Sequence, residues 1–237
     1  IAPTGKLRVG LYYGNPVLVQ KDSATESPKG VAADISQELG RKLGIPVQFI
    51  VYDGAAKLAA AVKAGEWDVA FLASDPARAN EISFAPPVLQ IEGVYLVAAS
   101  SSIRSMADVD REGVNIGVAA KNVYDVFLSR ELKHAHVLRT ATVLAAADSF
   151  VAGKVNVLAG GRPQMMEAAA KAPGARILDG RFMVINLTAG IPQGRAVAAQ
   201  YLRDVIEDLK ATGMVARSFE LSGASGAIVA PLVQGVP

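Results

Sequence analysis

The chain contains no cysteine among its 237 residues. Disulfides, thiolate metal ligands and a cysteine nucleophile are therefore all excluded. Histidine occurs only as His134 and His136, in "KHAH", and no third metal ligand lies near them in the sequence. The sequence also lacks a glycine-rich phosphate loop with a lysine, so we expect neither a metal site nor a cofactor.

Excess charge and long apolar runs are also lacking. The 24 basic and 22 acidic residues leave a net charge of +2, and the basic residues form no stripe. We therefore expect no binding to nucleic acid or to an anionic membrane surface. No uncharged apolar run approaches the roughly 18 residues that a spanning helix needs. Hydrophobic residues make up 51% of the chain and charged residues 19%, which is typical of a folded globular protein.

The first 90 residues alternate short apolar runs with amphipathic stretches. "KLRVGLYY", "PVQFIVY" and "WDVAFLA" have the character of strands. Between the first two, Val31, Ile35, Leu39 and Leu43 recur every four residues, as on one face of a helix. Residues 55 to 64 also have helical character, and Gly65 is the expected stop. This order of elements predicts parallel βαβ units.

A second series begins after a break expected at Pro86 and Pro87. Its expected strands are "GVYLVAA", "VNIGVAA", "HVLR" and "VNVLA", and its expected helices lie near 122–132, near 142–152 and from about 163. A long helix near 194–211 and a short one at "MVARSFEL" follow. Two such series predict two α/β lobes that face each other across a cleft, with ligands beyond the carboxyl ends of the strands.

Arg78 follows the strand "WDVAFLA", where loops usually carry binding chemistry. Its planar guanidinium can hold a carboxylate through two parallel hydrogen bonds, an interaction of about 1.5–3 kcal/mol. A surface ion pair with Glu81 or Asp75 is the alternative, and the local sequence alone does not separate the two.

Five segments together carry a family resemblance. They are, in order, "LRVGLYYGNP", "KGVAADISQELGRKLGIPVQFIVYD", "AAAVKAGEWDVAFLASDPARANEISFAPPVL", "VNIGVAAKN" and "FVAGKVNVLAGGRP". This sequence resembles the extracellular solute-binding proteins of family 3, the polar amino acid type, which are type II periplasmic binding proteins that serve ABC importers. The resemblance covers residues 5 to 220, and its most specific part runs from Gly65 to Pro86.

The resemblance implies an α/β type II periplasmic binding protein fold. One lobe would contain residues 1–92 and 188–237, and the other residues 93–187. Two hinge strands, at "EGVYLV" and "VINLTAG", would join the lobes, which close on the ligand. The implied function is that of a receptor that captures a small solute and delivers it to an ABC permease in the inner membrane. Such a protein is expected to be monomeric and to act in the periplasm or outside the cell.

The resemblance also implies a ligand site. The family arginine that matches Arg78 clamps the α-carboxylate of the ligand, and the backbone beside it, here at Ala73 and Ser74, contributes. The second lobe supplies a turn at a helix start, which here reads "AAKNVYD". Asn122 is a good N-cap residue there. The amides of Asn122 and Val123 are expected at the ligand, with Lys121 as a second cation, and capping of the helix alone is the alternative role of Asn122.

The departures from the family pattern concern the groups that recognise an amino acid. Gly161 stands where the amino acid binders have an aspartate for the ligand's ammonium group. Ala55 stands where an aromatic ring commonly stacks on the ligand. Ala70, Phe71 and Ala73 stand at serine positions. A buried ammonium without a carboxylate would cost several kcal/mol, so we predict an anionic ligand that need not carry an α-amino group.

Tyr12, Tyr13 and Asn15 are the remaining candidates for stacking and polar contacts. They follow the first strand, and each tyrosine has the alternative of a core or rim position. The start at "IAPTG", without methionine, fits an exported chain whose signal peptide has been removed, and equally fits a trimmed chain.

Two other functions stay open at this stage. The first is a sensing domain of a membrane receptor, which would look the same over this range. The second is an enzyme that resembles the cyclohexadienyl dehydratases, which would need an acid or base in the cleft. None of Asp53, Asp75 and Asp125 has a convincing position for that role, so we expect no catalysis. The tail "SGASGAIVAPLVQGVP" extends beyond the family pattern, and its role is left open.

Overall fold

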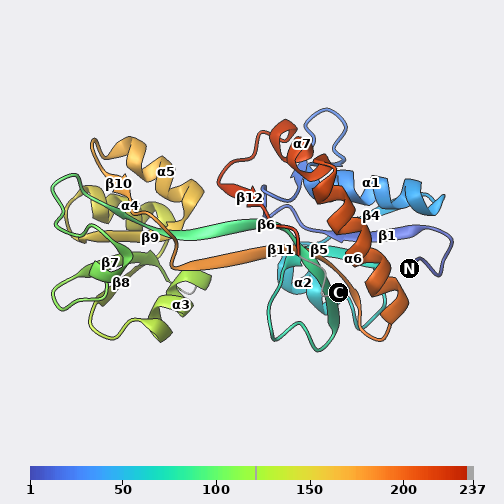
Figure 1. The fold of residues 1–237 in the computed structure, drawn as a ribbon, viewed down its shortest axis with the longest axis horizontal. Coiled ribbons are helices and arrows are strands. Elements are labelled where there is room, and N and C mark those ends of the chain that lie inside the picture. Colours follow the sequence, from blue (N-terminus) through green and yellow to red (C-terminus); the bar gives the residue numbers. More distant parts are fainter. Residues whose placement is uncertain (121, 234–237) are drawn as a thin grey trace. The chain divides into compact units, whose positions relative to one another are not determined.

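The computed structural model describes residues 1–120 and 122–233, and the chain divides into two compact units. Unit 1 contains Ile1–Gln90 and the described chain from Asn186 on, and unit 2 contains Ile91–Ile185. Both units are α/β, with strands and helices labelled in Figure 1. The chain passes between the units in two strands, β6 (Ile82–Val97) and β11 (Met183–Pro192).

Unit 1 is built on a mostly parallel sheet. Its strands lie in the order β4 (Val47–Val51), β1 (Leu7–Leu11), β5 (Val69–Ala73), β11 and β6. β1 pairs in parallel with β4 and β5, and β11 runs antiparallel to β5. The helices of this unit are α1 (Val31–Leu43), α2 (Ala55–Ala60), α6 (Ala196–Ala211) and α7 (Met214–Leu221). Two short strands, β2 (Gln20–Lys21) and β3 (Pro28–Lys29), form a separate antiparallel pair.

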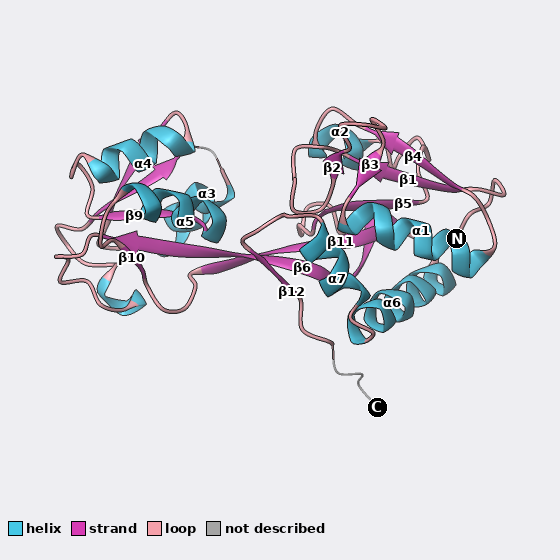
Figure 2. Ribbon diagram, turned by 90° about the horizontal axis from the view of Figure 1, so that it is seen from above, coloured by secondary structure: helices cyan, strands magenta, loops and turns pink. Residues whose placement is uncertain are grey.

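Both faces of this sheet are buried. Figure 2 shows α2 on one side of the sheet and α1, α6 and α7 on the other. On the α2 side, Leu58 and Trp67 are fully buried, and the Trp67 indole N–H donates to the Leu58 carbonyl over 2.9 Å. Gly10 leaves room for them, since a Cβ there would lie 2.5 Å from the Leu58 side chain. Burial on both faces explains why the strands of this unit are nearly continuous apolar runs.

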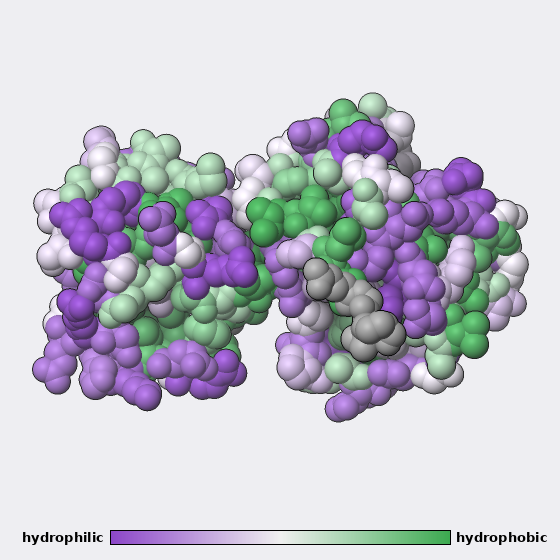
Figure 3. Space-filling view, in the orientation of Figure 1, coloured by the Kyte–Doolittle hydropathy of each residue, from purple (hydrophilic) through white to green (hydrophobic). Residues whose placement is uncertain are grey.

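The C-terminal tail packs on unit 1. Strand β12 (Ala227–Val229) pairs with β6, and the Ala230 N–H donates to the Val88 carbonyl over 3.0 Å. The buried Lys210 ammonium donates to the Pro231 carbonyl over 2.9 Å. Lys210 comes from α6, whose outer side is mostly hydrophilic in Figure 3. The described part of the tail, whose role the sequence left open, is therefore an additional strand held by α6.

Unit 2 contains a second parallel sheet. Strand β7 (Asn115–Ala119) pairs in parallel with β8 (His136–Thr140) and β9 (Val157–Gly161). β6 runs antiparallel to β9 and also pairs with the short β10 (Arg176–Ile177). The helices of this unit are the 3-10 turn η1 (Met106–Asp108), α3 (Val123–Glu131), α4 (Val143–Val151) and α5 (Arg162–Lys171).

Two apolar clusters, one on each face, hold the helices of unit 2. On the α3 face, Leu128 packs with Tyr95, Ile116 and Val118 from the sheet. On the opposite face, Phe150 of α4 and Met165 of α5 pack on Leu158. Met165 is fully buried, whereas the next residue, Met166, is 54% exposed. No helix among the described residues is long and apolar enough to cross a membrane.

Two expectations about elements are wrong. Pro86 and Pro87 do not break the chain, because β6 runs through both of them from Ile82 to Val97. The buried Thr188 hydroxyl of β11 donates to the Ala85 carbonyl over 2.7 Å and helps to satisfy the backbone there. Helix α2 ends at Ala60 rather than near residue 64, and hydrogen-bonded turns continue to Gly65. At Gly65 the backbone has a φ of 63°, a conformation that glycine adopts easily.

Candidate functional site

The carboxyl ends of three parallel strands meet at one edge of the unit 1 sheet. β1, β4 and β5 are parallel neighbours, so the loops that follow them leave the sheet on the same side. These loops carry residues 12–15, 52–54 and 74–80. In open α/β sheets this edge is where ligands bind. Most of the candidates named from the first half of the sequence lie here.

Arg78 sits in a compact turn directly after β5. The Asp75 carboxylate accepts the Ala77 N–H over 2.7 Å, and the Arg78 N–H donates to the Asp75 carbonyl over 3.0 Å. These bonds fix the turn, and the Arg78 side chain is partly buried. Its Nη1 donates to the carbonyl of Ala73, the last residue of β5, over 3.0 Å. The guanidinium is therefore held back against the edge of the sheet.

The alternative role of Arg78, an ion pair with Glu81 or Asp75, is not observed. Glu81 pairs instead with Lys63, at 3.0 Å. The Asp75 carboxylate is used by the backbone of the turn. Within the described chain no carboxylate forms an ion pair with Arg78, so most of its five N–H donors remain available.

Tyr12 lies beside Asn15 and within the influence of the charge of Arg78. The Tyr12 ring packs against the cluster that contains Leu58 and Trp67. Burial raises the pKa of the Tyr12 phenol, while a hydrogen bond with Asn15 and the positive charge of Arg78 act in the opposite direction. The structure thus places three of the predicted residues in one neighbourhood. Tyr13, the fourth candidate in this region, is partly buried in the turn after Tyr12.

The backbone around Arg78 is already in use. The Ala73 carbonyl accepts from Arg78, and the Ser74 N–H donates to the Asn186 carbonyl over 2.9 Å. Ala70 and Phe71, which stand at family serine positions, are buried in β5. Ala55, which stands at the aromatic position, begins α2. Unit 1 therefore offers a guanidinium, a phenol and an amide at this edge, while positions 70, 71 and 73 carry no hydroxyl.

In unit 2, the strands β7, β8 and β9 also end at a common edge. Asn122 caps α3 there, since its Oδ1 accepts the Asp125 N–H over 2.8 Å. Val123, the first residue of α3, is 52% exposed. Lys121, the predicted second cation, lies outside the described residues. The capping role of Asn122 uses its side-chain oxygen and leaves the ligand role a prediction.

Gly161 ends β9 and is the N-cap of α5. It lines a small cavity of about 40 Å³ together with Asn122, Tyr124 and Gln164. The apolar part of the wall comes from Ala119, Val143, Ala146, Leu158, Ala159, Gly160 and Met165. Sequence reasoning missed Tyr124 and Gln164. Their only signal is that each lies within three residues of a predicted site residue, Asn122 or Gly161.

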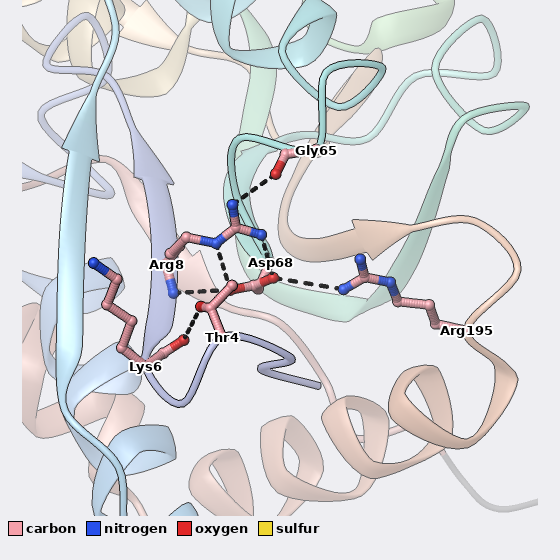
Figure 4. A network of polar contacts seen from close by, with 6 residues as sticks. All are labelled: Thr4, Lys6, Arg8, Gly65, Asp68 and Arg195. Carbon is pink, nitrogen blue, oxygen red and sulfur yellow. Dashed lines mark hydrogen bonds and ion pairs between the residues drawn. The ribbon is translucent and has the colours of Figure 1, made fainter.

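Two further charged clusters occur, one before β5 in unit 1 and one beside the end of β9 in unit 2. In unit 1, the fully buried Asp68 accepts two bonds from the Arg8 guanidinium, at 3.0 and 2.8 Å, and Arg195 lies 3.6 Å away (Figure 4). In unit 2, Glu92 pairs with Arg162 at 2.7 Å and Arg181 at 3.0 Å. Both clusters satisfy their carboxylates with arginines, so we interpret them as structural.

The carboxylates considered for catalysis are engaged elsewhere. Asp53 pairs with Lys57 at 2.8 Å and is 91% exposed. Asp125 is buried and pairs with Arg139 at 2.8 Å. The histidines lie at the start of β8, and the His134 N–H donates to Asp110 over 2.8 Å. No group of three or more metal-binding side chains occurs in the part of the chain that the structure describes.

Comparison with known proteins confirms the family resemblance. The model of the bacterial extracellular solute-binding proteins, family 3, matches residues 7–220. A search of curated proteins finds no significant match. Many solved structures match, however, and they confirm the type II periplasmic binding protein fold.

Three of the similar structures illustrate the kinds of protein that share this fold. An ancestral cationic amino acid solute-binding protein has a TM-score of 0.69 and 20% identity, covering 92% of this chain and 95% of its own. A putative binding component of an ABC transporter from Wolinella succinogenes, complexed with lysine, has a TM-score of 0.69 and 18% identity, with the same coverage of 92% and 95%. An ancestral cyclohexadienyl dehydratase has a TM-score of 0.60 and 20% identity, covering 92% of both chains. At these identities the likeness concerns the fold.

Proposed function

Because the chain belongs to the bacterial extracellular solute-binding proteins of family 3, we propose that it is the substrate receptor of an ABC importer. Its ligand is a small carboxylate, an amino acid or an organic acid of similar size. Ligand binding closes the two units by a hinge motion of the strands that connect them. The receptor acts as a monomer outside the cytoplasmic membrane and delivers the ligand to a permease.

Arg78 carries the proposal for an anionic ligand. Its guanidinium is partly buried at the ligand edge of the unit 1 sheet, and no acidic side chain of the described residues neutralises it. A bidentate carboxylate would satisfy the N–H groups that the Ala73 carbonyl leaves unused. Tyr12 and Asn15 follow β1 at the same edge of the sheet and are the candidates for further contacts with the ligand.

The partners of the candidate carboxylates favour binding without catalysis. A dehydratase needs an acid or base with a suitable pKa at the reacting atoms. Asp53 and Asp125 are bound to basic side chains, and the Asp75 carboxylate is bound to the backbone of its turn. The alternative of a sensing domain predicts a membrane-spanning segment in the full-length gene, and a receptor for import predicts permease and ATPase genes beside it.

Isothermal titration calorimetry tests the proposal directly. The probes are the L-amino acids and the 2-oxo and 2-hydroxy acids with the same side chains. We expect at least one carboxylate to bind, and Arg78→Ala to weaken its binding by about a hundredfold, which corresponds to roughly 3 kcal/mol. The melting temperature of the ligand-free protein should change little.

Arg217→Ala is the matched control, because Arg217 is an exposed arginine of the same unit. This variant should bind like the wild type. Unchanged affinity in Arg78→Ala would place the carboxylate elsewhere. Dehydration of a cyclohexadienyl carboxylate by the purified protein would instead support the dehydratase alternative.

A further inference from the structure

Two side-chain hydrogen bonds link the connecting strands β6 and β11 inside unit 1. The buried Thr188 hydroxyl of β11 donates to the Ala85 carbonyl of β6 over 2.7 Å. The Gln90 Nε2 of β6 donates to the Asn186 Oδ1 of β11 over 2.9 Å. Gln90 and Asn186 are the residues of unit 1 at which the two strands leave it. The amide pair therefore joins the strands at their last point within the unit.

Asn186 also contacts the end of the strand that precedes Arg78. β11 runs antiparallel to β5, with Leu187 opposite Ala73. One position further along, the Ser74 N–H donates to the Asn186 carbonyl over 2.9 Å. Asn186 thus uses its backbone to hold the end of β5 and its side chain to hold β6.

A short series of bonds therefore runs from the ligand edge of unit 1 to both connecting strands. It begins with the Arg78 Nη1, which donates to the Ala73 carbonyl over 3.0 Å. The next residue, Ser74, is bonded to Asn186, and Asn186 is bonded to Gln90. All five residues belong to unit 1.

The amide pair differs from the Thr188 bond in its exposure. Gln90 and Asn186 are partly buried, whereas Thr188 is only 1% exposed. Water largely compensates for the loss of a partly exposed hydrogen bond, whereas the loss of a buried one leaves the Ala85 carbonyl without this partner. We therefore expect the Thr188 bond to matter mainly for stability. The amide pair can be removed with little effect on the fold, so its effect on binding can be measured separately.

We propose that Gln90 and Asn186 are positioning residues that couple ligand binding at Arg78 to the connecting strands. A carboxylate held by Arg78 fixes the end of β5 in one arrangement, and the bonds through Asn186 impose that arrangement on β11 and β6 together. Without the pair, β6 bends independently of β11, and more conformations compete with the ligand-bound one. This inference rests on the proposed function, because it requires a ligand at Arg78.

Calorimetry on variants of the pair tests the coupling. The probe is the L-amino acid, 2-oxo acid or 2-hydroxy acid that the wild type binds most tightly. Gln90→Met removes the amide donor at nearly the same side-chain length. We expect it to weaken binding about fivefold, the effect of one hydrogen bond, and to change the melting temperature by less than about 2 °C. Unchanged affinity would overturn the inference.

The reversed pair Gln90→Asn/Asn186→Gln is the rescue variant. It keeps an amide on each strand and the same total side-chain length, so it should regain most of the affinity that Gln90→Met loses. If it binds no better than Gln90→Met, the bond between the amides does not provide the coupling and the inference is wrong.

Thr188→Val is the matched control, because it removes the other side-chain bond between the same two strands. It should lower the melting temperature by about 3 °C and leave the affinity within about twofold of the wild type. A fivefold loss of affinity in Thr188→Val as well would show that any weakening of these strands lowers binding, and the specific role of the amide pair would be refuted.

A double-mutant cycle tests whether the pair acts through Arg78. In an Arg78→Ala background the series lacks its first bond, so Gln90→Met should change the remaining affinity less than about twofold. An equal fivefold loss in both backgrounds would mean that the pair acts independently of Arg78.

Hydrogen exchange, measured with and without the probe, follows the two strands directly. In the wild type, the probe should slow amide exchange around residues 89–92 of β6 and 184–187 of β11 together. In Gln90→Met the slowing should be confined to β11, whose backbone bond to Ser74 remains. Equal slowing in both strands of the variant would contradict the proposal.

The outcomes separate this inference from the proposed function. If Arg78→Ala weakens binding but Gln90→Met does not, the receptor proposal stands and the role of the amide pair falls. If none of the carboxylate probes binds, both proposals fall.

Discussion

The arginines at the two ends of strand β5 differ in whether they pair with a carboxylate. Before the strand, the Arg8 guanidinium spends two N–H donors on the buried Asp68 and a third on the Gly65 carbonyl, at 2.7 Å. After the strand, Arg78 makes one bond to the Ala73 carbonyl and pairs with no carboxylate of the described chain. The arginine before β5 therefore stabilises the fold, whereas the arginine after β5 remains available to bind a ligand.

This difference shows how to separate structural from functional charges. A buried carboxylate must be paired, and Asp68, with no exposed surface, is paired by Arg8. An arginine can remain without a carboxylate where it is partly in contact with water, as Arg78 is. The comparison predicts that changes before β5 alter stability, whereas changes after it alter binding.

Removing the charge of Asp68 should have the largest effect on stability. Asp68→Asn leaves the partly buried Arg8 and the nearby Arg195 without their counter-ion, so we expect a loss of about 3 kcal/mol in the free energy of unfolding. Urea denaturation measures this loss. Asp53→Asn is the control, since its exposed pair with Lys57 should be worth under about 1 kcal/mol. Similar losses in the two variants would contradict the comparison.

Exchanging arginine for lysine should distinguish the stabilising role of Arg8 from the binding role of Arg78. Arg8→Lys keeps the charge but loses the forked bonds to Asp68, so we expect a loss of about 2 kcal/mol in stability with unchanged ligand affinity. Arg78→Lys should have the reverse effect, with unchanged stability and a carboxylate affinity that falls roughly tenfold. Thermal unfolding and calorimetry on both variants measure the two effects. A loss of stability in Arg78→Lys would mean that this end is structural as well.

Glu92 of unit 2 offers a smaller test that depends on pH. Burial acts to raise the pKa of Glu92, but bonds from Arg181 and Arg162 outweigh it, so the pKa lies below its ordinary value of 4.5. Its contribution to stability is therefore present above that value and is lost as the pH falls through the lowered pKa. Glu92→Gln should cost about 1–2 kcal/mol at pH 7 and progressively less toward pH 3.

Denaturation curves between pH 3 and 8 check the Glu92 prediction. The exposed Glu112→Gln is the matched control and should show no such trend. A cost that stays constant across this range would mean that the charge of Glu92 does not provide the stabilisation.

The sequence predicted the elements well where each one carries its own apolar pattern. The helix on Val31, Ile35 and Leu39 was expected, and these residues are buried in α1. The strand at Pro86 and Pro87 was missed, because local rules treat two prolines as a break. The neighbours of this strand are distant in the sequence, since β11 and β12 lie beside β6 and the Thr188 hydroxyl donates to the Ala85 carbonyl.

The site was predictable only in part, for a related reason. The position of Arg78 at the edge of the sheet could be predicted, because Arg78 directly follows a strand. That it lacks an acidic partner could not, because Glu81 pairs with Lys63 only in the folded chain. The glycine at position 161 is visible in the sequence. That Tyr124 and Gln164 lie beside it is not, because they come from different helices and meet only in the folded unit.

Strand β12 has a practical consequence for engineering. The C-terminal segment is bound along β6 through Val88 and is gripped by the Lys210 ammonium, and β6 is one of the two strands that continue into unit 2. A fluorescent protein joined directly after Val233 would follow a segment that is paired with this connecting strand. Position 233 is therefore the preferred attachment point for a reporter of ligand binding.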